Sequence, residues 1–284
     1  MPTETINYLR FVYRFPVIAQ LWKYLAALTV YSTIIVIYNE HQSPVPGVEP
    51  RGKGNEAILA GIVFGWLMSF RNNVAYARWW DGRSLWGQLV NESRNLALKA
   101  RQFLPDGHTA RELGSLITSF AEALKRHLRN SPPWEPGKPP PQPGPHVPME
   151  ITAQIYQLLH REKTESRIDG FLFLSIDQHA RELMNICGAC EKIKNTPMAL
   201  SYRGLLRKGI TGYMLVLPWI MVHDLEWFTV PVMVLTGYAL IGLELIAASI
   251  ENPFGHDGDD LPLDEIVETI RRGVRVVFPE EPAP

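Results

Sequence analysis

One long hydrophobic stretch in the C-terminal third limits the folds open to this chain more than any other feature. From Gly209 to Ile250 almost every residue is apolar, and the exceptions are a polar break at residues 223–226 and a lone Glu244. A transmembrane helix needs about 20 consecutive apolar residues, so the stretch predicts two spanning helices joined by a polar turn. Pro218 and Pro231 fit this interpretation, because membrane helices tolerate proline better than water-exposed helices do.

Two shorter apolar runs lie nearer the N-terminus, from Tyr24 to Tyr38 and from Ala57 to Phe70. Each alone could be a buried helix of a soluble bundle, since neither reaches the usual spanning length. Flanking aromatic residues such as Trp22 and Trp79 extend them, because aromatic rings favour the headgroup level of a bilayer. The mean hydropathy of -0.05 averages these runs with polar segments. We therefore predict four transmembrane helices, at about 22–40, 57–76, 208–223 and 227–250.

Basic residues gather on one side of the predicted spans. They precede the first span, follow the second and precede the third: Arg10, Arg14, Lys23, Arg71, Arg78, Arg83, Arg203, Arg207 and Lys208. The two connections on the other side carry little basic excess. Because cytoplasmic segments next to spans are enriched in Lys and Arg, we expect a multi-pass protein of the cell (plasma or inner) membrane with both termini in the cytoplasm.

The region between the two pairs of spans, about 82–207, is predicted to be helical and cytoplasmic. Apolar residues recur there at three- and four-residue spacing, for example from Glu112 to Leu128. A Pro-rich loop at 130–148 interrupts it, since proline cannot donate a backbone hydrogen bond. That loop could bind a partner domain, but a plain surface loop is the simpler interpretation. Residues 251–284 are expected to form a C-terminal tail.

Several functional classes find no support in the sequence. The 28 basic and 29 acidic residues nearly cancel, which gives no electrostatic basis for nucleic-acid binding. Cys187 and Cys190 form a C-x-x-C pair without a second pair to complete a zinc site, so we expect them on a buried helix face. No H-E-x-x-H, G-x-S-x-G or P-loop motif occurs. We therefore expect that the protein is not an enzyme, and the sequence predicts no cofactor except the possible Ca²⁺ considered below.

Four motifs in the same order resemble the bestrophin family. The densest runs from Phe70 to Gly87 and includes R-W-W; the others are R-F-P at Arg14–Pro16, N-T-P at Asn195–Pro197 and N-P-F-G at Asn252–Gly255. The resemblance covers nearly the whole chain. It implies an all-α fold in which residues 1–284 form one channel domain, with four transmembrane helices and a cytoplasmic helical region. It also implies a homopentamer around a central pore for inorganic ions.

The resemblance further implies that the second span lines the pore with an apolar neck. Ile62, Trp66 and Phe70 are four residues apart, so each lies about 40° around a helix from the last. They fall where the family places its neck, and a narrow apolar ring can gate conduction by losing its water. Spacing alone would equally allow these residues to face lipid or a neighbouring helix.

Two further sites follow from the resemblance. A cytoplasmic aperture formed by one side chain per subunit falls near Phe171, although a buried core Phe is the simpler interpretation of that position. A calcium clasp of the family matches Asn252, Asp257 and Asp260, with backbone oxygen from the region of Thr3. These groups supply the oxygen ligands that Ca²⁺ prefers. The alternative is a helix end followed by a solvated acidic turn, since His256 and Gly258 replace acids.

Passive ion conduction is the function that the resemblance implies, with chloride as the named ion of the family. A monovalent-cation (sodium-type) channel of the same fold is the alternative, because no charge along the predicted neck decides the sign. A non-conducting membrane scaffold and a membrane-embedded enzyme are the remaining alternatives, and the second lacks a catalytic set.

Overall fold

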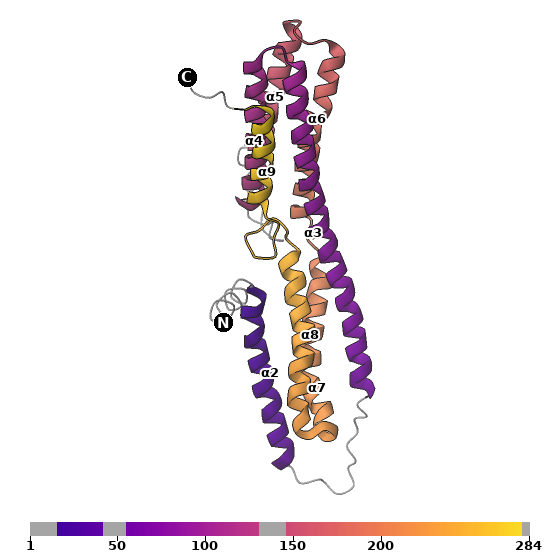
Figure 1. Ribbon diagram of the computed structural model, residues 1–284. Helices are drawn as coiled ribbons and strands as arrows, with labels where there is room; N and C mark the ends of the chain where they lie inside the picture. Colours follow the sequence, from indigo (N-terminus) through magenta and orange to yellow (C-terminus); the bar gives the residue numbers. More distant parts are fainter. Residues whose placement is uncertain (1–15, 42–54, 131–145, 280–284) are drawn as a thin grey trace, which may run out of the picture. The chain divides into compact units, whose positions relative to one another are not determined.

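The computed structural model describes residues 16–41, 55–130 and 146–279. Every regular element within these residues is a helix, and none is a strand (Figure 1). The prediction of an all-α fold is confirmed. Thr3, Arg14, Phe15 and most of the Pro-rich segment lie outside the described residues, so what was predicted for them stays a prediction.

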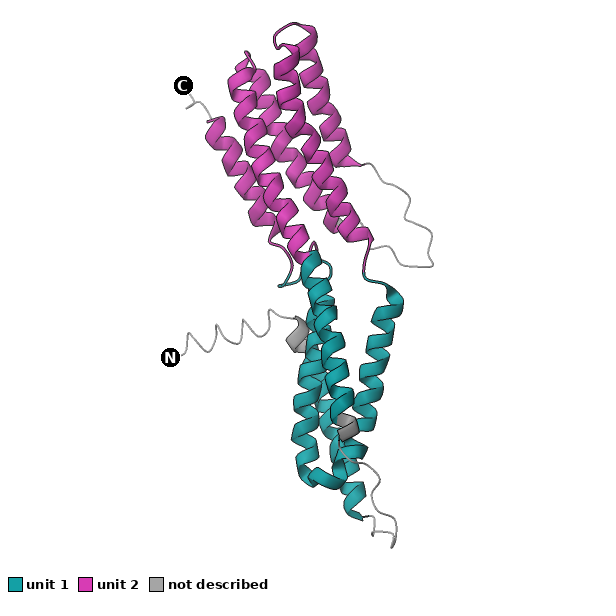
Figure 2. Cartoon of the chain, turned by 90° about the vertical axis from the view of Figure 1, so that its right-hand side faces the viewer, with its two compact units in different colours: residues 1–78, 198–252, 257–259 teal, residues 79–197, 253–256, 260–284 magenta. Residues whose placement is uncertain are grey.

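The chain forms two compact units (Figure 2). Unit 1 consists of residues 1–78, 198–252 and 257–259, and unit 2 of residues 79–197, 253–256 and 260–284. Helix α3 (Asn55–Phe103) contributes to both units, whereas every other described helix belongs to one. The residues predicted as a single domain therefore carry two separately packed cores.

Unit 1 is a bundle of apolar helices. It contains α2 (Pro16–His41), the first part of α3, α7 (Leu200–Leu225) and α8 (Thr229–Ile250), with the short 3₁₀ helix η1 (Glu226–Phe228) between the last two. Helices α7 and α8 lie side by side as a hairpin, and α2 packs against both (Figure 1). Their core is apolar: Met68, Leu206, Ile210, Met214, Leu217, Met233 and Leu240.

The predicted spans fall on the helices of unit 1, but their bounds differ from the prediction. By length and composition, three stretches suit membrane crossing: Gln20–His41, Ile58–Phe103 and Leu200–Ile250, the last of which contains both α7 and α8. Helix α3 has 49 residues without a break, where the sequence predicted the span to end near residue 76. That is more than twice the roughly 20 residues that cross the hydrocarbon core, so α3 continues beyond its span.

Unit 2 is a second helical bundle. It contains the remainder of α3 with α4 (Gly107–Asn130), α5 (Val147–Thr164), α6 (Gly170–Asn195) and α9 (Leu263–Val277). Helix α4 packs against α5 and α9, and α5 packs against α6. The largest core side chains include Trp86, Phe120, Leu113, Leu124 and Ile155, all fully buried. The predicted helical region between the two pairs of spans is confirmed as helical.

The predicted C-terminal tail, residues 251–284, contains helix α9, which was not predicted. Five of its apolar residues recur at three- and four-residue spacing and are buried: Leu263, Ile266, Val267, Ile270 and Val274. The spacing places them on one face of a helix, and that face packs on α4. Close packing at this contact depends on Gly114, where an added Cβ would lie 2.8 Å from the Phe278 ring.

Both cysteines are fully buried on α6, as predicted. Burial, and to a smaller extent the nearby Glu191 carboxylate, raise the pKa of the Cys187 thiol to about 12. Burial likewise raises the pKa of the Cys190 thiol. Since the thiolate is the reactive and metal-binding form, these protonated thiols serve as small apolar core residues.

Candidate functional site

An exposed apolar stripe runs along the part of α3 that belongs to unit 1. Ile62, Trp66 and Phe70 are 64%, 62% and 48% exposed in the single chain. The Trp66 and Phe70 rings meet edge to face with centroids 4.8 Å apart, an arrangement that aromatic quadrupoles favour. The three predicted neck residues therefore share one open face of the helix.

The opposite side of α3 carries a fully buried charge. Arg71 is 0% exposed, and its Nε lies 3.1 Å from Oε2 of Glu244, while its Nη1 lies 2.9 Å from Oε2 of Glu251. At 100° per residue, Arg71 lies about 140° around the helix from Trp66. Because a buried charge needs a partner of opposite sign, this contact fixes which face of α3 points into unit 1 and which points out.

Two arginines of α7 complete what we call the ion-pair cluster: Arg71, Arg203, Arg207, Glu244 and Glu251. The Nε of Arg207 lies 2.8 Å from Oε1 of Glu244, and Nη1 of Arg203 lies 3.8 Å from Oε2 of Glu251. The Met198 backbone N–H donates to Oε1 of Glu251 at 3.0 Å. The cluster thus links α3 to α7 and to the end of α8.

Sequence reasoning missed the ion-pair cluster. It used Arg71, Arg203 and Arg207 only to orient the spans, and it noted Glu244 only as a charge in an apolar helix. The lone Glu244 was the available signal, since a carboxylate within a membrane helix nearly always has a partner inside the bundle. The identity of that partner, 173 positions away, requires the fold.

Phe171 lies in the first turn of α6 and is 85% exposed in the single chain. The side chain of Asp169 caps this helix by accepting a 2.7 Å hydrogen bond from the Leu172 N–H. Leu174, one turn after Phe171, is also exposed. The interpretation of Phe171 as a buried core residue is therefore wrong, and its role at an aperture stays a prediction.

The predicted calcium ligands lie in the turn that follows α8. Asn252 and Asp257 are exposed residues of unit 1, and Asp260 is a half-buried residue of unit 2. Within unit 2, an added Cβ at Gly255 would lie 2.5 Å from Oδ2 of Asp260, so this carboxylate lies against the turn's backbone. Calcium binding here stays a prediction.

Comparison with known protein families shows which family the chain belongs to. A family model described as "Bacterial/Fungal Bestrophin protein" matches residues 2–276. The chain belongs to the bestrophin family. The resemblance read from the four motifs is confirmed.

Two curated relatives of this bestrophin are cyanobacterial. The "Voltage-dependent anion channel-forming protein sll1024" of Synechocystis sp. is 35% identical over 76% of this chain and 75% of its own length. The "Voltage-dependent anion channel-forming protein alr2987" of Nostoc sp. is 32% identical over 93% of this chain and 89% of its own length.

Solved structures match the fold of this bestrophin. A "bacterial Bestrophin homolog from Klebsiella pneumoniae" superposes with a TM-score of 0.79 at 24% identity, covering 91% of this chain and 98% of that one. A crystal structure of a protein described only as "a membrane protein" gives a TM-score of 0.81 at 23% identity, with 91% of this chain covered and 98% of that one. The predicted bestrophin-like fold is confirmed, and the chain is a membrane protein.

Proposed function

We propose that this bestrophin is the pore-forming subunit of a homopentameric ion channel that conducts chloride passively. The family and the names of the relatives indicate a channel protein and not an enzyme. Those relatives are named anion channel-forming proteins, which favours an anion over the monovalent-cation alternative.

The observation that carries the proposal is the apolar stripe on α3. Ile62, Trp66 and Phe70 are open on one face, while Arg71 is buried on the other. Five copies of this face around an axis would form stacked apolar rings. A narrow ring of this kind holds water poorly and gates ions by wetting and drying. The ion-pair cluster supports the role, because it holds α3 at a fixed rotation.

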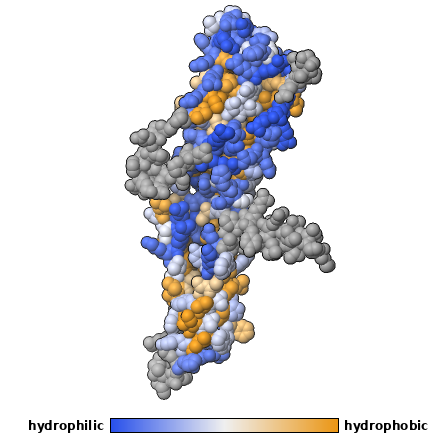
Figure 3. Space-filling model, turned by 90° about the vertical axis from the view of Figure 1, so that its left-hand side faces the viewer, coloured by the Kyte–Doolittle hydropathy of each residue, from blue (hydrophilic) through white to orange (hydrophobic). Residues whose placement is uncertain are grey.

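Apolar side chains on the surface of unit 2 support self-association. They include Leu98, Phe171, Leu174 and Val276, all exposed in the single chain. On the face shown in Figure 3, hydrophobic residues are interspersed with hydrophilic residues. We assign the partner that would cover these exposed side chains to copies of the same chain. Phe171 is our candidate for the cytoplasmic aperture.

The proposal also covers the location of the protein and its dependence on calcium. The basic residues flanking the spans favour the cell membrane with cytoplasmic termini. The turn at Asn252, Asp257 and Asp260 has few acids, and calcium affinity follows the charge count of a site. We therefore expect conduction to persist in a calcium chelator.

Chloride efflux from liposomes tests the proposal. Purified protein in vesicles loaded with KCl should release chloride when valinomycin lets K⁺ leave, with and without EGTA. Protein-free vesicles are the control for leakage. A correctly folded protein that releases no chloride would instead favour the monovalent-cation channel or the non-conducting scaffold.

A further inference from the structure

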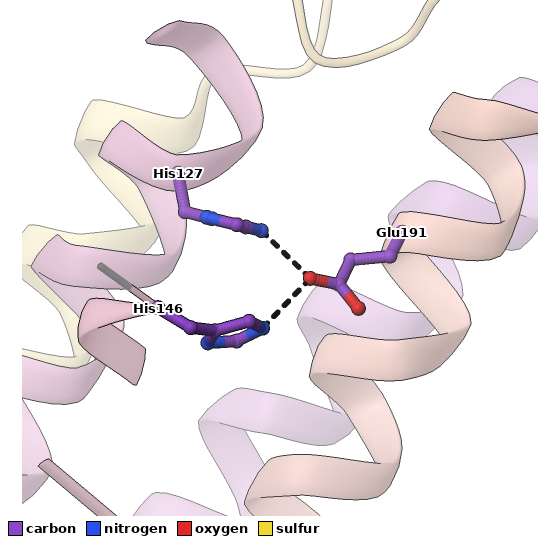
Figure 4. Close-up of side chains that lie close together, drawn as sticks. All are labelled: His127, His146 and Glu191. Carbon is purple, nitrogen blue, oxygen red and sulfur yellow. Dashed lines mark hydrogen bonds and ion pairs between the residues drawn. The ribbon is translucent and has the colours of Figure 1, made fainter. Parts of the chain in front are cut away.

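Two histidines and one glutamate converge within unit 2, and none of the three belongs to the apolar stripe or the ion-pair cluster. His127 lies in the last turn of α4, His146 immediately precedes α5, and Glu191 lies in α6. The Nε2 atoms of both histidines point at the same carboxylate oxygen, Oε1 of Glu191, at 2.7 and 2.9 Å (Figure 4). The two rings stack at a tilt, with centroids 4.7 Å apart.

The chemistry of this trio suits a transition metal. One ligand atom from each side chain lies within 4.8 Å of the other two, and among the described residues no other three His, Cys, Asp or Glu side chains converge this closely. Zinc binds imidazole nitrogen and carboxylate oxygen at about 2.0–2.2 Å and often takes three protein ligands with one open position. Two imidazoles disfavour Ca²⁺ and Mg²⁺, which prefer oxygen.

We propose that His127, His146 and Glu191 form a zinc site, with water or a small anion in the fourth position. The side chains are 25%, 28% and 29% exposed, so the site is sheltered and still open to an entering ion. In a tetrahedral site with such bond lengths, ligand atoms lie about 3.3 Å apart. Each nitrogen therefore has to move a few tenths of an ångström from the carboxylate oxygen, and the two nitrogens, which lie within 4.8 Å of each other, also have to settle at about that separation.

Zinc binding by His146 requires its ring proton to move from Nε2 to Nδ1, and the start of helix α5 can accommodate this change. The Nδ1 atom of His146 accepts from the Met149 N–H at 3.2 Å, so the neutral ring carries its proton on Nε2 and donates it to Glu191. Zinc takes the Nε2 lone pair, and the ring proton moves to Nδ1 through solvent exchange. The Met149 N–H then keeps its other acceptor, the His146 carbonyl at 2.9 Å.

Two cysteines and a lysine of α6 lie near the proposed zinc ligands in the sequence. Cys187 and Cys190 lie on the same helix as Glu191, but both side chains are fully buried in the core of unit 2, so they are not expected to compete for the metal. Lys194 donates to the Leu128 carbonyl at 2.5 Å.

A bound zinc ion would tie the end of α4 and the start of α5 to α6. His127 precedes the Pro-rich loop and His146 lies near its C-terminal end, so one ion would close the chain between them. An ion that binds only the folded chain stabilises it by mass action. We therefore expect zinc to raise the thermal stability of the chain.

Zinc titration of the full-length chain, stripped with EDTA and exchanged into metal-free buffer, tests the site. We expect one zinc per chain by calorimetry, together with a higher Tm. His127→Gln and Glu191→Gln should each weaken zinc binding at least tenfold and remove most of the Tm increase. His160→Gln, at an exposed histidine of α5, is the matched control and should bind zinc like the wild type.

Cobalt provides a readout that needs no variant. Co²⁺ added to the stripped wild type should give the intense visible absorption of a four-coordinate site, and zinc should abolish it. The proposal is overturned if the wild type binds no zinc, if Co²⁺ gives only a weak octahedral spectrum, or if His127→Gln and Glu191→Gln bind zinc as tightly as His160→Gln does.

Discussion

Arg71 is the most deeply buried charged residue among those that the structure describes in unit 1. Its guanidinium is fully buried and lies against two carboxylates from the far end of the chain. A buried ion pair adds little net stability by itself, but removing one partner leaves a charge that neither water nor protein neutralises. The same residue therefore stabilises unit 1 and sets the direction in which the apolar stripe points.

Replacing Arg71 should destabilise the protein far more than replacing its more exposed neighbour. Arg71→Gln removes the guanidinium nearest to the Glu251 carboxylate, and breaking a buried pair costs about 3–5 kcal/mol. Arg207→Gln removes a half-exposed partner and should cost about 1 kcal/mol or less. Thermal unfolding in detergent measures both. Equal decreases in Tm would contradict the assignment of Arg71 as the central charge.

Trp66 is the residue on which the proposed neck depends most. Trp66→Ala should widen the ring and ease wetting, so single-channel conductance should rise. Leu235→Ala is the matched control, because Leu235 is an apolar residue of α8 with similar exposure, and its conductance should stay at the wild-type value. Unchanged conductance for Trp66→Ala in a folded oligomer would place Trp66 away from the pore.

At the scale of elements, hydrophobic runs predicted the helices well and their ends poorly. The four apolar runs fall on α2, α3, α7 and α8. The end of the second span was misplaced because no proline or cap separates the apolar part of α3 from its polar continuation. Helix α9 was missed although its apolar spacing was readable. The ion-pair cluster was unreadable, because its partners meet only through tertiary structure.

Helix α9 is attached to α4 by charge as well as by its apolar face. The carboxylate of Asp264 lies 2.8 Å from Nζ of Lys125 and 2.7 Å from Nη1 of Arg129. Hydrogen bonds from Lys125 and then from Arg129 lower the pKa of Asp264 from 3.8 to about 2. A carboxylate whose pKa is lowered in the folded chain contributes stability above its unfolded pKa and loses that contribution as the pH falls through the folded pKa.

Asp264→Asn should therefore lower stability only slightly, with the full loss present above about pH 4. The group is mostly solvent-exposed, so we expect a loss below about 1 kcal/mol. Tm values of wild type and variant should differ at pH 6 and converge as the pH falls from about 4 to about 2. Glu150→Gln, at an exposed carboxylate of α5, is the control. A difference that persists unchanged at pH 2 would contradict this account.

At the scale of the whole molecule, the proposed pore needs further copies of the chain to close around the apolar stripe. Native mass measurement in detergent should give a dominant species of five times the 32.2 kDa chain. Closed rings are the usual outcome when each copy contacts the next through the same pair of surfaces. A dominant monomer or dimer would rule out a pore built from five copies of α3.

The most direct test of the central claim is the reversal potential of the reconstituted channel under a tenfold NaCl gradient. An anion channel passes chloride down the gradient and leaves the concentrated side positive. The account therefore predicts a reversal potential approaching about 59 mV, positive on the concentrated side. A reversal potential of the opposite sign would contradict chloride selectivity and assign the pore to cations. The absence of single-channel currents from folded protein would contradict the pore itself.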